Sequence, residues 1–321
     1  MQRYCFVLAS ALLLLAASPA LAQPYPNKPI RIFVPFAAGG AVDTLARLLA
    51  NKLSEQLGQT VLVENRAGAG GNLAPDALAK SPPDGYTVLQ TTNGIAISPA
   101  LYRTLPFDVH KDFVAVTQLV SSQLVFAANP KLEASSIAEF IALAKAKPGG
   151  LNYGSTGIGN PLHLTMEMLK SATGINVQPV PYRGDAPLNT ALIAGEIQVA
   201  VVPMATVLSH LEAGTLKALA IGGAKRSPAL PNVPTIMESG VPDYEMSGWF
   251  GILAPAGTPP AVAQRLRDEV AKAVAAPDLV ATLGSQGMVP LATAPDDWAK
   301  YLKSELDVYT KITKEANIKP E

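Results

Sequence analysis

The stretch VPFAAGGAVDTLARLL, residues 34–49, places two glycines between an apolar run and an amphipathic one. The run IRIFVPF, at 30–36, is short and rich in β-branched side chains, which is typical of a buried strand. From Val42 onward the apolar residues recur at helical spacing, and this pattern ends at Gly58. The stretch therefore predicts a strand, a glycine turn and a helix in direct succession.

The same alternation continues along the chain. TVLVEN (60–65) and YTVLQT (86–91) are predicted strands, and between them lie a second glycine turn, RAGAGGN (66–72), and a short helix over 73–81. Such alternation predicts parallel strand pairs joined by right-handed crossovers.

A second module of the same kind occupies residues 124–222. Its predicted elements are a strand at 123–129, a helix at 135–147, two further helices that follow LNYGSTGIGN (151–160) and VQPVPYRGD (177–185), and buried strands at 196–202 and 216–222. The sequence therefore predicts an α/β protein with two lobes, each a sheet flanked by helices.

The rest of the chain lacks a third sheet-forming pattern. Residues 222–249 are rich in proline and predict an ordered, irregular connection, whereas 260–286 and 296–315 have helical spacing. We expect these helices to pack on the existing lobes. The predicted lobe I then comprises residues 23–123 plus 224–321, and lobe II comprises residues 124–223.

The first 22 residues predict a secretory signal peptide. Arg3 precedes an apolar run, and Ala20-Leu21-Ala22 forms a small-residue cleavage site, so the exported protein should begin at Gln23. The run is shorter than the roughly 20 residues that span a bilayer, which argues against a membrane anchor. Cys5, the single cysteine, lies inside this segment, so no disulfide is expected after cleavage.

Composition narrows the classes of partner. The chain has 25 basic and 25 acidic residues and no basic block, which argues against nucleic-acid binding. We expect a periplasmic monomer with no cofactor. We also expect no metal site, because the three histidines, His110, His163 and His210, lack the spacing of metal ligands.

The glycine turns predict a site for an anion. Where a strand leads into a helix, free N–H groups carry the positive end of the helix dipole, and glycine lets a ligand approach them. Such turns occur at 39–40, 68–71, 154–160 and 184, at the carboxyl ends of the predicted strands. Since ligands of open α/β sheets bind at that edge, we expect one site between the lobes.

Several motifs resemble those of one family from about Tyr25 to the C-terminus. They are YPNKPIRIFVPFAAGGAVDTLAR, VENRAGAGGNLAPDALAKSPPDGYT, LNYGSTGIGNPLHL, VPYRGDAPL and KRSPALPNVPTIMESGVPDYEMSGWFGILAPAGTP. The chain thus resembles the substrate-binding proteins of tripartite tricarboxylate transporters, also called Bug proteins. The resemblance implies a two-lobed, type II-like periplasmic binding protein that closes over a small carboxylate. This ligand would be a mono- or dicarboxylate, aliphatic or aromatic. The protein would deliver it to membrane permease subunits.

The resemblance also implies which residues bind the ligand. The first two glycine loops, 36–43 and 65–72, would act as pincers that face residues of lobe II. The candidate ligand-binding residues are Phe36, Ala38, Gly39, Gly40, Asp43, Arg66, Gly68, Ala69, Gly70, Ser155, Thr156, Asn160, Tyr182, Arg183, Gly184 and Val202.

Three of these candidates have simpler structural roles open to them. Asp43 has the position of a residue that stabilises the start of a helix, Arg66 that of a solvated surface charge, and Phe36 that of a core side chain.

Relatives that bind amino acids often have an acid at the strand end where this chain has Val202. Because a buried ammonium without a partner is unfavourable, Val202 favours a carboxylate that is not an amino acid.

Two other functional classes remain to be weighed. The glycine turns do not match G-x-G-x-x-G, no Walker lysine follows them, and GSTG is not the G-x-S-x-G elbow, so the sequence does not favour an enzyme. A periplasmic sensor that presents its ligand state to a receptor kinase would have the same fold and site. The sequence leaves that alternative to transport open.

Overall fold

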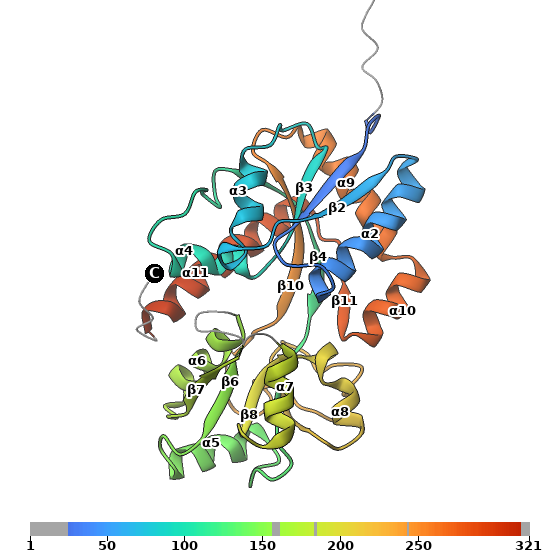
Figure 1. Cartoon of the computed structure of the whole chain (residues 1–321). Coiled ribbons are helices and arrows are strands. Elements are labelled where there is room, and N and C mark those ends of the chain that lie inside the picture. The colour runs from blue at the N-terminus through green and yellow to red at the C-terminus, as the bar shows by residue number, and fades with distance from the viewer. Residues whose placement is uncertain (1–24, 156–160, 183–184, 243, 316–321) are drawn as a thin grey trace, which may run out of the picture.

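The structure, a computed structural model, describes residues 25–155, 161–182, 185–242 and 244–315. These residues form two α/β lobes, one above the other in Figure 1, each built around its own sheet. The predicted signal peptide lies outside the described residues. Within the described ranges, no helix combines the length and the apolar character needed to cross a membrane.

Lobe I contains a six-stranded sheet in the order β11-β4-β10-β3-β1-β2. Its strands are β1 (Ile30–Val34), β2 (Val61–Asn65), β3 (Thr87–Thr92), β4 (Phe113–Ser122), β10 (Gly248–Pro255) and β11 (Met288–Pro290). Its helices are α2 (Ala41–Leu57), η1 (Ala69–Gly71), α3 (Leu73–Ala79), α4 (Gly94–Leu101), α9 (Pro260–Val274), α10 (Pro277–Ser285) and α11 (Pro295–Glu315).

Lobe II contains a five-stranded sheet in the order β7-β6-β8-β5-β9. Its strands are β5 (Leu124–Ala128), β6 (Asn152–Ser155), β7 (Gln178–Pro181), β8 (Val199–Pro203) and β9 (Lys217–Ile221). Its helices are α5 (Ile137–Ala146), α6 (Pro161–Thr173), α7 (Asp185–Ala194), η2 (Met204–Thr206) and α8 (Leu208–Glu212).

The parallel pairing predicted for the first module is confirmed. β1 lies between β2 and β3 and is parallel to both. The side chains of β1 alternate between the two faces of the sheet: Ile32 and Val34 pack with α2 and α9, and Phe33 packs with α3 on the opposite face. Figure 1 shows α2, α9 and α10 on one side of this sheet and α3, α4 and α11 on the other.

The sequence reading missed β4, the longest strand of the sheet. β4 pairs antiparallel with β10, which in turn pairs antiparallel with β3, so the sheet is mixed rather than parallel throughout. Polar residues interrupt the apolar pattern of β4, but the fold satisfies them: Thr117 Oγ1 donates to the carbonyl of Thr293, 2.9 Å away, and the N–H of Gln118 donates to Thr293 Oγ1 at 3.0 Å.

Two neighbouring connections join the lobes. Gln123 links β4 to β5, and residues 222–247 lead from β9 back to β10. At the crossings, Gly222 N donates to Leu124 O, at the start of β5, at 2.9 Å, Met246 N donates to Gly222 O at 2.8 Å, and Gly248 of β10 pairs with Ser122 of β4. Both crossings therefore lie side by side, as a hinge requires, and the predicted lobe boundaries stay a proposal.

A buried polar cluster anchors the start of β10 beside this hinge. The amide of Asn93 accepts a hydrogen bond from the N–H of Trp249 at 2.9 Å and donates to the hydroxyl of Tyr309 at 2.8 Å. Trp249 Nε1 donates to Glu305 Oε2 at 2.7 Å, and burial raises the pKa of the Glu305 carboxyl. Hydrogen bonds thus hold α4, β10 and α11 together at the point where the chain re-enters lobe I.

Candidate functional site

Two glycine loops meet at one edge of the lobe I sheet. Because β1 and β2 are adjacent and parallel, with Val34 opposite Asn65, the loops that follow them leave the sheet side by side. The predicted residues Phe36, Ala38, Gly39 and Gly40 of the first loop are exposed, as are Gly68, Ala69 and Gly70 of the second. The structure therefore brings both predicted pincers together on the surface of lobe I.

Asp43 clamps these two loops to each other. Its carboxylate accepts hydrogen bonds from the N–H of Gly39 at 2.9 Å, from Arg47 Nε and Nη2 at 3.0 Å each, and from Asn65 Nδ2 at 2.8 Å. Asn65 Nδ2 also donates to the carbonyl of Phe36, 3.0 Å away. One carboxylate thereby fixes the first loop, the start of α2 and the end of β2.

The chemistry of Asp43 follows from these contacts. The Arg47 guanidinium, followed by the N–H of Gly39 and the Asn65 amide, lowers the pKa of the Asp43 carboxyl to about 2, although burial opposes this shift. Only 3% of the residue is exposed. Asp43 therefore positions the loops, and direct contact with a ligand stays a prediction. Its partner Arg47 was not predicted, although it lies one turn after Asp43 on the same helix; Asn65 begins the predicted second loop but was not among the candidate ligand-binding residues.

The start of α2 offers free hydrogen-bond donors. Gly40, the N-cap residue, supplies no side-chain cap, and the first helical bond runs from Thr44 N to Gly40 O at 2.9 Å. Within the described residues, the N–H groups of Ala41, Val42 and Asp43 have no acceptor. α2 has 17 residues, so its dipole adds to the positive potential at this end. This geometry suits an anion.

The second loop has an unusual backbone. Four successive residues have positive φ: Gly68 at 133°, Ala69 at 48°, Gly70 at 63° and Gly71 at 95°. A Cβ added to Gly70 would collide with the hydroxyl of Tyr102, and one added to Gly71 would touch the ring of Phe36 at 3.5 Å. Glycine is therefore required here both for conformation and for close packing, and Phe36 contacts the second loop rather than the core.

Arg66 is engaged within lobe I. Its Nη2 donates to Glu64 Oε1 at 2.6 Å, and its guanidinium lies 4.3 Å from the centre of the Phe33 ring. Phe33 faces α3, on the side of the sheet away from α2. The structure shows these contacts for Arg66, and its contact with a ligand stays a prediction.

Part of the predicted wall on lobe II is described. Ser155 ends β6 and is buried, Tyr182 follows β7 and is partly exposed, and the N–H of Tyr182 donates to Ser155 O at 2.8 Å. The structure thus brings these two predicted residues together at one sheet edge. Thr156, Asn160, Arg183 and Gly184 lie outside the described residues.

The structure contradicts the prediction that Val202 lines the cleft. Val202 has no exposed surface; it pairs with Val125 of β5 and packs in an apolar cluster with Leu188 of α7. The physical reason is that β8 is the central strand of its sheet and is covered by helices on both faces. The argument against amino-acid ligands depended on Val202 and so loses its basis.

Two acceptors on lobe II were not predicted. Asp185 is the first residue of α7, and no other group interacts with it in the described part of the chain; burial raises the pKa of its carboxyl. Asn189, one turn further, donates from Nδ2 to Thr206 O at 3.1 Å, whereas its buried Oδ1 has no hydrogen-bond partner among the described residues. Asp185 belongs to the motif VPYRGDAPL, so an acid directly after a glycine turn was the available signal.

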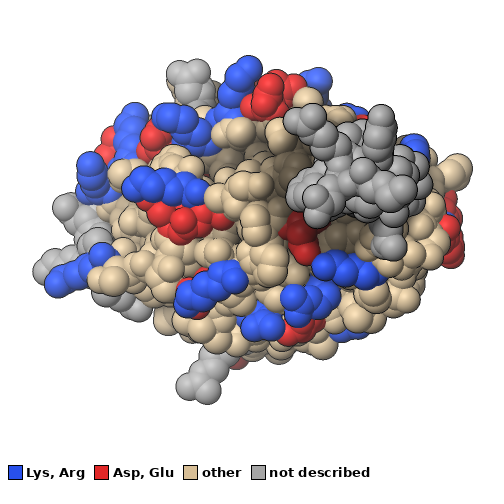
Figure 2. Space-filling view, turned by 90° about the horizontal axis from the view of Figure 1, so that it is seen from above, with Lys and Arg blue, Asp and Glu red and all other residues tan. Residues whose placement is uncertain are grey.

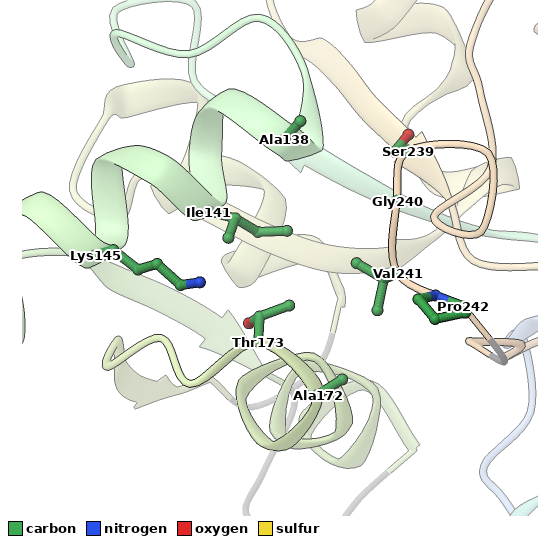
Figure 3. Close-up of a pocket in the computed structure, with 9 residues that line it drawn as sticks. All are labelled: Ala138, Ile141, Lys145, Ala172, Thr173, Ser239, Gly240, Val241 and Pro242. Atoms are coloured by element: carbon green, nitrogen blue, oxygen red, sulfur yellow. The ribbon is translucent and has the colours of Figure 1, made fainter.

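The hollows found elsewhere on the described surface are lined by residues other than the predicted site residues. A hollow of about 320 Å³ lies between α5, α6 and residues 239–242, and none of the predicted site residues lines it (Figure 3). On the face shown in Figure 2, basic and acidic side chains are intermixed. Among the described residues, no group of three or more His, Cys, Asp or Glu side chains could hold a metal ion.

Known proteins share this architecture over nearly the whole chain. BugT of Bordetella pertussis is 36% identical over 305 residues, which cover 94% of each chain. A structure of R. palustris Rpa4515 with adipate has a TM-score of 0.82 and 36% identity and covers 92% of this chain and 100% of its own. The structure of the periplasmic binding protein BugD has a TM-score of 0.78 and 30% identity and covers 92% of this chain and 100% of its own.

The family model described as "Tripartite tricarboxylate transporter family receptor" matches residues 45–318. This range includes most of α2, the whole lobe II sheet, the hinge and every strand of the lobe I sheet except β1; β1, the first glycine loop and the first residues of α2 precede it. The two-lobed fold, the paired glycine loops and these matches agree. The chain therefore belongs to the tripartite tricarboxylate transporter receptor family, TctC, the family of the Bug solute-binding proteins.

Proposed function

We propose that this protein captures a small carboxylate, a mono- or dicarboxylate, between its lobes and delivers it to the permease subunits of a tripartite tricarboxylate transporter. The observation that carries this proposal is the start of α2, where N–H groups have no acceptor among the described residues and the Asp43 clamp ties the first glycine loop to Asn65 at the end of β2. The relatives support it, since Rpa4515 was solved with adipate and BugD is a periplasmic binding protein. Export to the periplasm after cleavage at Ala22, and action as a monomer, belong to the same proposal.

The physical basis of capture is preorganisation. A carboxylate oxygen accepts strong, charge-assisted hydrogen bonds from backbone N–H groups, and the helix dipole adds to its attraction. The Asp43 clamp holds these donors in place before the ligand arrives, so little conformational entropy is lost on binding. The negative charge of Asp43 is neutralised by Arg47, which limits its repulsion of an incoming anion.

Thermal unfolding with candidate ligands tests the proposal. Benzoate, succinate, adipate, terephthalate, citrate, glutamate and aspartate are added separately at equal concentration and pH 7. A ligand at a hundredfold its Kd stabilises the native state by about 2.7 kcal/mol. We expect at least one to raise the Tm by several degrees, at roughly 2–4 °C per kcal/mol. If none of these carboxylates shifts the Tm, the carboxylate site is refuted.

Closure of the hinge has its own measurement. Because the two connections between the lobes lie side by side, rotation about them should bring lobe II toward the glycine loops without breaking either sheet. We expect small-angle scattering to show a smaller radius of gyration when a ligand that raises the Tm is added at saturation. Identical profiles with and without that ligand would argue against closure while leaving the binding role intact.

A further inference from the structure

The lobe II sheet directs the carboxyl ends of three strands toward lobe I. β6 is parallel to both β7 and β8, so their carboxyl ends share one edge. At that edge Met204, just after β8, donates its N–H to Gln123 O at the hinge, 3.0 Å away. Its sulfur would lie 3.0 Å from a Cβ added to Gly287, a lobe I residue. Residues at this edge therefore border the space between the lobes.

α7 begins at this edge with two acceptors on one face. Asp185 and Asn189 are four residues apart, which places them one above the other on the helix. Asn189 is held at the edge by its hydrogen bond to Thr206, in the segment that follows β8. The first residues of α7 lie toward the upper lobe in Figure 1.

Both acceptors lack a donor in the described residues. Asn189 is 8% exposed, and its Oδ1 is buried without a hydrogen bond. Asp185 is partly buried, and none of the described residues places a cation or a donor beside it, which agrees with the raised pKa that burial gives its carboxyl. An acid at a helix start is favoured by the dipole alone, but Asp185 accepts no N–H bond here and so does not cap α7. Burying acceptors without donors is unfavourable, so this pair, which finds no donor among the described residues, is suited to accept a hydrogen bond from a ligand.

We propose that Asp185, supported by Asn189, is the specificity determinant for a ligand whose end opposite the carboxylate is a hydrogen-bond donor, an ammonium or a hydroxyl group. The inference depends on the proposed function, because it takes the carboxylate end to bind at the start of α2. Lobe I then supplies donors to an anion, and lobe II supplies acceptors to a donor. A second carboxylate at the lobe II end would meet the like charge of Asp185.

A matched ligand series tests this specificity by calorimetry at pH 7. The series has three sets of compounds, with chains of three, four and six carbons. Every compound in a set has a carboxylate at one end, and the other end is a methyl, hydroxyl, ammonium or second carboxylate group. The four-carbon set is butyrate, 4-hydroxybutyrate, 4-aminobutyrate and succinate. We expect the hydroxyl or ammonium member of at least one set to bind about 10- to 100-fold more tightly than the methyl and dicarboxylate members, the range for a hydrogen bond to a charged group.

Variants separate Asp185 from general effects of charge. Asp185→Asn should reduce that preference to within about threefold and improve the relative binding of the dicarboxylate. Glu133→Gln removes one negative charge from lobe II at an exposed ion pair with Lys147, between β5 and α5, and should leave the preference unchanged.

The outcomes distinguish the two proposals. If the dicarboxylate binds most tightly in every set, or if Asp185→Asn leaves the preference intact, the role of Asp185 is refuted and the carboxylate site on lobe I stands. If no member of any set binds, this inference is refuted, and the proposed function fails with it only if none of the carboxylates in the thermal unfolding test shifts the Tm.

Discussion

Replacing Gly39 with valine is expected to abolish carboxylate binding while the protein stays folded. Gly39 lies in the first glycine loop, and a Cβ built on it meets no protein atom within 4 Å, so a larger side chain would occupy the space beside the free N–H groups. Blocking approach to two such donors should raise the Kd on the order of 100-fold or more. Calorimetry with a ligand that raises the Tm of the natural protein measures this loss.

The control for this variant is Gly58→Val, at the other end of the same helix. Gly39 and Gly58 both have positive φ, 89° and 61°, and both have open space around the added Cβ. Each substitution should therefore cost about 1–2 kcal/mol of stability through backbone strain. Only Gly39→Val should lose binding, and equal binding by the two variants would show that the ligand does not approach the first glycine loop.

Replacing Asp43 with alanine is expected to lower the free energy of unfolding by about 2–4 kcal/mol, because charge-assisted hydrogen bonds to Gly39, Arg47 and Asn65 are lost together. The freed glycine loops should also bind carboxylates more weakly. Urea unfolding gives the first quantity and calorimetry the second. Asp307→Ala, which removes an exposed ion pair with Lys303, is the matched control and should cost less than about 1 kcal/mol.

The pH dependence of the Asp43 effect has a defined sign. The native pKa of Asp43, about 2, lies below the value near 3.9 of an unfolded aspartate. Its stabilisation is therefore fully present above about pH 4 and is lost as pH falls through about 2. The difference in stability between the natural protein and Asp43→Ala should be constant from pH 5 to 8 and shrink below pH 4. A difference that grows on acidification would contradict the Asp43 clamp.

Much of lobe I followed from local pattern alone. The apolar run at 30–36, the glycines at 39–40 and the helical spacing from Val42 predicted β1, the first loop and α2, which ends before Gly58 as expected. Local signals suffice here because strand burial, glycine conformation and helix periodicity are properties of short segments. β4 was not predicted, because the polar residues Thr117 and Gln118 interrupt its apolar pattern. Their hydrogen-bond partner is Thr293, which lies far along the chain.

The sequence by itself determined the fold class, the two glycine loops and the family resemblance, because these depend on residue types at fixed spacing. Only the tertiary structure decided how the residues meet. Asp43 proved to join both loops through Asn65, Val202 proved to lie in a core cluster, and Asp185, at the edge of lobe II, proved to have no partner among the described residues. The physical reason is that hydrogen-bond partners and burial are set by segments distant in the chain, and no short stretch of sequence specifies which segments will surround it.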